Sequence, residues 1–77
     1  MVMAGEMLTK EQRVLWKRSE QRGGVESMTD DELREWAQAC RKLAEHSDAG
    51  PAKSAKARRL WRQRLAEAEA TLAERTS

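Results

Sequence analysis

Hydrophobic residues between positions 30 and 47 recur every three or four residues, which is the spacing of one face of a helix. They are Leu33, Trp36, Ala37, Cys40, Leu43 and Ala44. Thr29 and Glu32 just before them have the spacing of a capping box. The pattern predicts an amphipathic helix over about 30–47.

A second stripe predicts a helix over about 51–74. It consists of Ala57, Trp61, Leu65, Ala68 and Leu72, and Pro51 after Gly50 suits the first helical position. The break between the two helices is short, and a short loop favours antiparallel neighbours. Folding at this break brings Trp36 near Leu65 and Cys40 near Trp61. The two stripes then match along their whole length. We therefore expect an all-α fold built on an antiparallel helical hairpin, packed like a short coiled coil.

A shorter helix is predicted over about 10–22. Thr9 and Gln12 repeat the capping-box spacing, and Gly23-Gly24 gives the chain freedom to turn. The apolar side of this helix is thin, so we expect it to pack on the hairpin or to be swapped to a second chain. Residues 1–8 are expected to be flexible.

The chain has 77 residues, of which 39% are hydrophobic and 36% charged. We expect 1–77 to form a single small helical domain, near the size at which one core is barely sufficient. Pairing of two chains into a homodimer is therefore an open alternative. Alanines on the third predicted helix either face solvent or allow close approach in such a dimer: Ala55, Ala66, Ala70 and Ala73.

Charge is distributed in blocks, although the net charge is only +2. Residues 28–50 carry six Asp or Glu against three Lys or Arg, whereas 51–64 carry six Lys or Arg and no acid. Such a basic block fits a solvated surface, an acidic protein partner or a nucleic-acid backbone. The candidate partner-binding residues in it are Lys53, Lys56, Arg58, Arg59 and Arg62.

Trp16 is the remaining candidate for partner binding. It lies at the edge of the thin apolar side of the first helix, beside Lys17 and Arg13. It either docks on the hairpin or anchors a partner, because an exposed Trp beside Arg is typical of interfaces.

Two DNA-binding motifs are disfavoured. Leu65 and Leu72 follow the basic block seven residues apart, but two leucines are too few for a zipper and the block lacks a base-reading Asn. The predicted helices are also longer than a helix-turn-helix needs.

The sequence offers no set of residues for catalysis or metal binding. Cys40 and His46 are six residues apart and point to different sides of one helix, so they cannot chelate one ion. The acids at 30–35 lie at an exposed helix start, where capping is the simpler role. We expect a non-enzyme with no cofactor, no metal and no small-molecule substrate. No apolar run reaches the length of a membrane span and Cys40 is alone, which favours a cytoplasmic location.

These features indicate a small protein–protein interaction module, acting as a regulator or adaptor. The absence of Phe, Tyr, Ile and Asn suggests a GC-rich bacterial genome, and the small size suggests a phage or mobile element. The alternative is a nucleic-acid-binding accessory protein that uses the basic segment 53–64.

Overall fold

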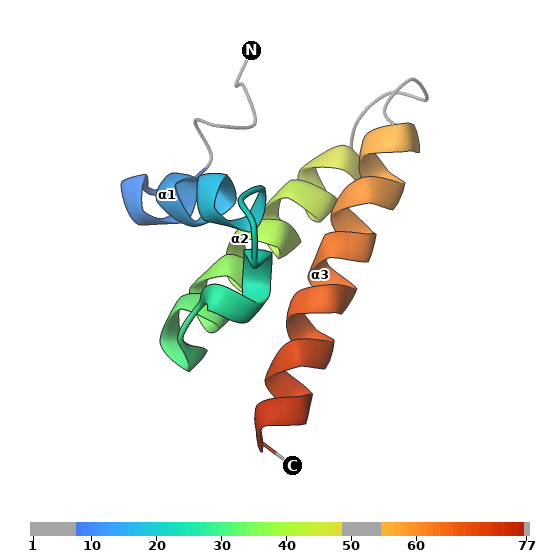
Figure 1. The fold of residues 1–77 in the computed structure, drawn as a ribbon. Coiled ribbons are helices and arrows are strands. Elements are labelled where there is room, and N and C mark those ends of the chain that lie inside the picture. The colour runs from blue at the N-terminus through green and yellow to red at the C-terminus, as the bar shows by residue number, and fades with distance from the viewer. Residues whose placement is uncertain (1–7, 49–54, 77) are drawn as a thin grey trace.

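The computed structural model of the protein describes residues 8–48 and 55–76. Its elements are α1 (Lys10–Ser19), the short 3₁₀ helix η2 (Gly24–Ser27), α2 (Asp30–Asp48) and α3 (Ala55–Thr76). The two long helices run antiparallel and pack along each other, and α1 crosses α2 (Figure 1). The predicted all-α fold and its helical hairpin are confirmed.

Both predicted capping boxes are present. The Thr9 hydroxyl accepts from the backbone N–H of Gln12 at 3.1 Å, and the Gln12 side chain accepts from the Thr9 N–H at 3.0 Å. Thr29 and Glu32 make the same pair of bonds at 3.1 and 2.9 Å. Each box satisfies backbone donors that the first helical turn leaves without partners.

The first helix ends at Ser19, three residues before the predicted end at 22. The N–H of Gln21 bonds to the carbonyl of Arg18, and that of Gly24 bonds to the carbonyl of Gln21, so the chain tightens into turns. Gly23 and Gly24 then take φ angles of 94° and 49°, which glycine adopts without steric cost. The turn continues into η2, which the spacing of hydrophobic residues did not predict.

The hairpin itself is close to its predicted bounds, since α2 ends at Asp48 and α3 ends at Thr76 rather than 74. The predicted helix start at Pro51 lies outside the described residues, as do residues 1–7 of the segment expected to be flexible. Leu8, the last residue of that segment, is buried in the core.

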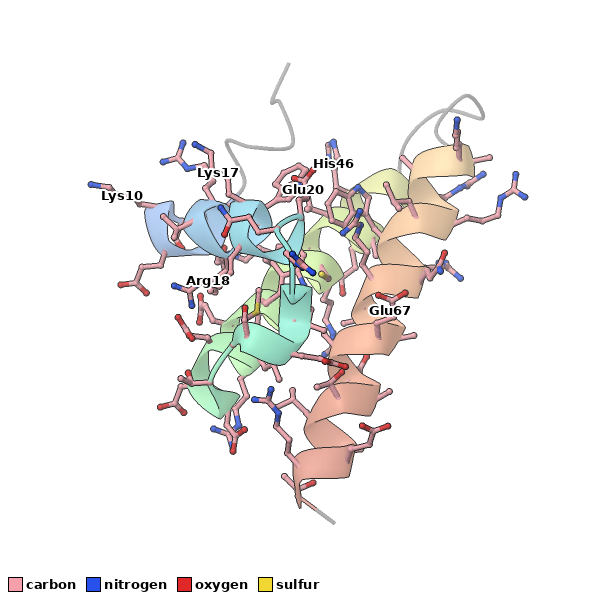
Figure 2. The ribbon with its side chains drawn as sticks, in the orientation of Figure 1. Lys10, Lys17, Arg18, Glu20, His46 and Glu67 are labelled. Carbon is pink, nitrogen blue, oxygen red and sulfur yellow. The ribbon has the colours of Figure 1, made fainter. Side chains whose placement is uncertain are left out.

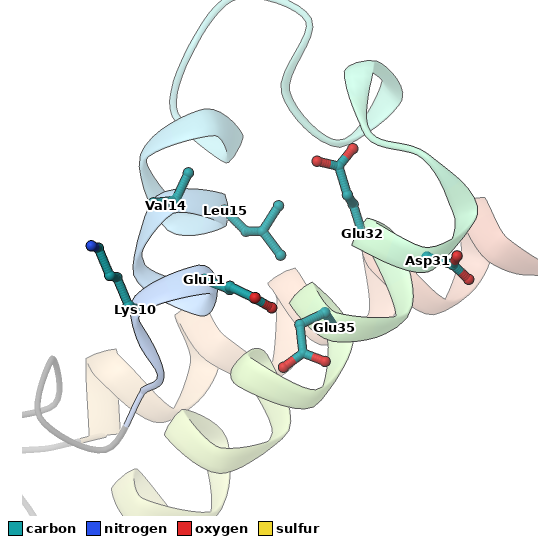
Figure 3. Close-up of a pocket in the computed structure, with 7 residues that line it drawn as sticks. All are labelled: Lys10, Glu11, Val14, Leu15, Asp31, Glu32 and Glu35. Atoms are coloured by element: carbon teal, nitrogen blue, oxygen red, sulfur yellow. The ribbon is translucent and has the colours of Figure 1, made fainter.

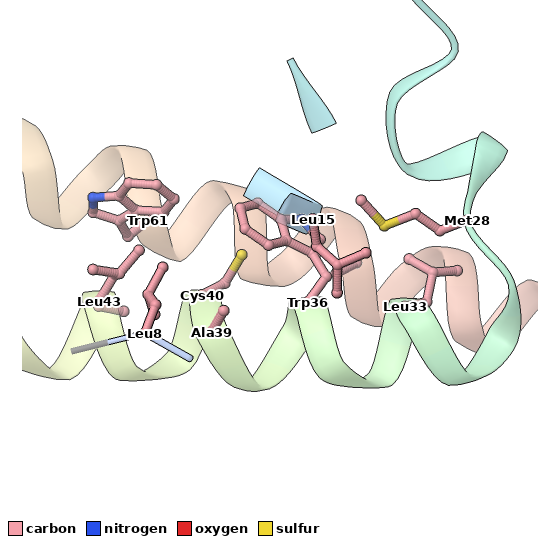
Figure 4. Packing of buried hydrophobic residues seen from close by; sticks show 11 residues of the cluster. Leu8, Leu15, Met28, Leu33, Trp36, Ala39, Cys40, Leu43 and Trp61 are labelled. Carbon is pink, nitrogen blue, oxygen red and sulfur yellow. The ribbon is translucent and has the colours of Figure 1, made fainter. Parts of the chain in front are cut away.

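The core lies between α2 and α3 and is closed by α1 (Figure 4). Trp36 and Trp61 are 1% and 7% exposed, and their rings meet edge to face with centroids 6.3 Å apart. The two predicted stripes therefore face each other. Ala39, which the predicted stripe omitted, is fully buried, while Ala37 is only half-buried. The core is displaced toward Ala39 because α1 covers that side of α2.

Arg75 fixes the far end of the hairpin. Its guanidinium donates to the carbonyls of Met28 and Glu26 at 2.6 and 3.2 Å, and to the Asp30 carboxylate at 3.1 Å. These contacts join the last turn of α3 to the residues that precede α2. They hold the link between η2 and α2 against the hairpin.

Candidate protein-binding groove between α1 and α2

Trp16 docks on the hairpin. Its ring meets Trp61 at right angles with centroids 4.9 Å apart, and Trp61 in turn contacts Trp36. The Arg64 guanidinium lies over the Trp61 ring, 5.7 Å from its centroid, a distance that allows cation–π attraction. Aromatic pairs in this geometry contribute about 0.5–1.5 kcal/mol beyond their burial. The contact between the Trp16 and Trp61 rings holds α1 against α3 and leaves Trp16 half-buried.

Gln12 holds α1 against α2 through a buried polar network. Its side chain is 1% exposed, and its amide donates to the Glu35 carboxylate at 2.8 Å. The Lys42 ammonium donates to the amide oxygen of Gln12 at 3.1 Å, and the N–H of Thr9 donates to the same oxygen. A buried amide with this many bonds is satisfied, so it fixes the position of α1 at little desolvation cost.

A second polar contact fixes the other end of α1. Arg18 forms an ion pair with Glu32 at 2.5 Å. Figure 2 shows Arg18 and Lys17 on different sides of α1, with Arg18 toward the start of α2. The pKa of Glu32 is lowered, first by the hydrogen bond from the Thr29 backbone N–H and also by Arg18. Glu32 therefore serves the α2 cap and the contact between helices.

Between these two contacts lies a hollow of about 490 Å³, which we call the acidic groove. Its apolar part is formed by Val14, 53% exposed, and Leu15, 4% exposed. The charged side chains around it come from both helices (Figure 3): Lys10, Glu11, Asp31, Glu32 and Glu35. Arg18 pairs with Glu32, and Arg34 pairs with Asp31 at 2.8 Å, so Glu11 and Glu35 supply the negative charge that remains beside Lys10. The rim is therefore weakly negative.

The sequence did not identify this groove. The pattern of residues predicted a thin apolar side for the first helix and a capping role for the acids at 30–35. The groove forms only when α1 crosses α2 at this position. Gln12 and Arg18 set that position through partners 23 and 14 residues away along the chain. The only local signal is an apolar Val14 in a helix too thin in hydrophobic residues to stand alone.

Four of the five basic candidates lie on α3, and these four do not line the acidic groove. Lys56, Arg59 and Arg62 are exposed and Arg58 is half-buried, whereas Lys53 lies outside the described residues. Arg58, Arg59 and Arg62 gather around Ala55 on a shallow hollow of about 420 Å³. The structure thus brings three of the five basic candidates together.

Neither Cys40 nor His46 takes part in these surfaces. Cys40 is fully buried, and burial raises the pKa of its thiol to about 12. His46 is exposed in the last turn of α2 (Figure 2). Within residues 8–48 and 55–76, no three His, Cys, Asp or Glu side chains gather where they could hold a metal ion.

None of the helices in the described ranges has the length and apolar character needed to cross a membrane. No family model, curated protein or solved structure matches the chain.

Proposed function

We propose that the protein is a small non-enzymatic protein–protein interaction module, a regulator or adaptor that binds through the acidic groove. The observation that carries this proposal is Val14, a large apolar side chain left 53% exposed at the edge of the acidic groove. On its other side lie Lys10, Arg13 and Lys17 of α1. Partially exposed apolar side chains at the centre of a polar rim are typical of binding surfaces.

The frame around the groove supports binding by a preformed surface. Trp16, Gln12 and Arg18 each fix α1 through a contact with another helix. A partner therefore meets helices that are already in place, and little conformational entropy is lost when it binds. Because the rim is negative, the complementary partner carries Lys or Arg around an apolar side chain.

This function is tested by affinity capture from the host with matched variants. Val14→Lys removes the exposed apolar group and adds a positive charge inside the groove. Ala70→Lys adds the same charge at an exposed position of α3, away from the groove. Proteins retained by the wild type and by Ala70→Lys but lost with Val14→Lys identify partners of the groove. Equal retention by all three contradicts the proposal.

A second candidate function is nucleic-acid binding through α3. It is favoured by the cluster of Arg58, Arg59 and Arg62 around one hollow. Changing these three residues together to Gln should abolish a gel shift, and the wild-type affinity should fall steeply with added salt. A gel shift that persists in the triple variant contradicts this candidate.

A further inference from the structure

The acidic groove has a counterpart on α3 of the same chain. Lys56, Arg59, Leu60 and Gln63 are spaced i, i+3, i+4 and i+7, so they share one side of the helix, and all four are exposed. We call this surface the Leu60 face. Leu60 is 42% exposed, and together with Val14 it is one of the two large hydrophobic side chains that stand exposed in the described part of the chain.

The two surfaces are complementary in charge. The acidic groove offers an apolar hollow beside the carboxylates of Glu11 and Glu35, which remain after Asp31 and Glu32 pair with arginines. The Leu60 face offers an apolar side chain beside Lys56 and Arg59. A hollow of about 490 Å³ is ample for a leucine side chain and the stem of a neighbouring Lys or Arg. The surrounding charges bring basic groups against acidic ones, which orients the contact.

Within one chain the two surfaces do not meet. The groove is lined by residues of α1 and α2 alone, and Leu60 lies on α3. We propose that the Leu60 face of one copy docks into the acidic groove of a second copy. The proposal rests on the proposed function, and it names the partner of the groove as this same chain.

The contact joins two different surfaces, so it is heterologous and leaves each copy with one groove and one face to offer. Successive copies can close into a ring or continue into an open polymer. The surfaces are small, and contacts of that size are weak and transient. Self-association should therefore depend on concentration and weaken as salt screens the charges.

Sedimentation equilibrium of the purified chain tests the proposal. From about 10 µM to about 1 mM, the range of weak contacts, the average mass of the wild type should rise above 8.8 kDa by about 1.5-fold or more. Val14→Lys and Leu60→Glu should each remain at 8.8 kDa. Ala70→Lys and Ala70→Glu should associate like the wild type. Circular dichroism verifies that every variant is folded.

Mixing the two defective variants gives the sharper result. Val14→Lys keeps an intact Leu60 face and Leu60→Glu keeps an intact groove, so an equimolar mixture should contain a species of twice the monomer mass. A contact between two identical surfaces gives no such heterodimer. If the mixture of the two variants contains only monomers, the proposal is overturned. A wild type that is monomeric at every concentration also overturns it. If host capture nevertheless depends on Val14, a foreign protein occupies the groove and the proposed function survives.

Discussion

Gln12 is the buried polar side chain on which the position of α1 depends, and its removal should destabilise the protein. Gln12→Ala deletes the hydrogen bonds to Glu35 and Lys42 and the capping bond from Thr9. Each bond is worth about 1 kcal/mol, since Glu35 and Lys42 are only half-buried and regain water. We predict that the free energy of unfolding falls by about 2–3 kcal/mol. For a chain of this size that is a large share of the total.

The assay is urea unfolding followed by tryptophan fluorescence, with Gln38→Ala as the matched control. Gln38 is an exposed residue of α2, so its replacement by Ala should change stability by less than about 0.5 kcal/mol. A double-mutant cycle of Gln12→Ala with Glu35→Ala should show a coupling energy of about 1 kcal/mol. If the two Gln variants unfold at the same urea concentration, Gln12 does not hold α1 on α2, and the reasoning is refuted.

Four further predictions concern other contacts. Trp16→Ala should lower the free energy of unfolding by about 2–3 kcal/mol, which is less than the loss for a fully buried Trp. The control Lys17→Ala should lower it little. Equal losses for the two variants in thermal unfolding contradict the docking of Trp16. Arg75→Ala should cost about 1–2 kcal/mol and speed amide exchange at Met28, whereas unchanged exchange argues against its carbonyl bonds. Since the pKa of Cys40 is raised to about 12, the thiol should resist a disulfide reagent at pH 8 until urea is added. The free energy of unfolding should fall as pH rises above about 9, because only the thiol of the unfolded chain ionises there. Because the pKa of Glu32 is lowered, its stabilising effect is present above about pH 4.5 and is lost in acid, so Glu32→Gln should flatten the fall in stability below that pH.

The hairpin could be predicted because its determinants are local and periodic. Trp36 and Trp61 each stand in a stripe of helical spacing, and Thr29 with Glu32 marks a helix start within four residues. Pairing the two stripes then follows from the short loop. Burial of Leu33, Leu43 and the two indoles agrees with that reading.

The placement of α1 could not be predicted, because it depends on polar contacts between residues far apart in the chain. Gln12 looked like a capping residue alone, yet its side chain also reaches Glu35 and Lys42. Trp16 had two open interpretations, and the structure shows its ring against Trp61. Its role in binding a partner remains a prediction. The acidic groove was missed for the same reason, since it exists only once α1 crosses α2.

The three indoles provide the most direct test of this arrangement, on which the groove depends. Trp61 contacts Trp36 at 6.3 Å and Trp16 at 4.9 Å between ring centroids. In a nuclear Overhauser spectrum of the purified protein, ring protons of Trp61 should show cross-peaks to ring protons of both other tryptophans. A spectrum with the Trp36 cross-peaks but without those to Trp16 would leave the hairpin intact and contradict the docking of α1, and with it the groove.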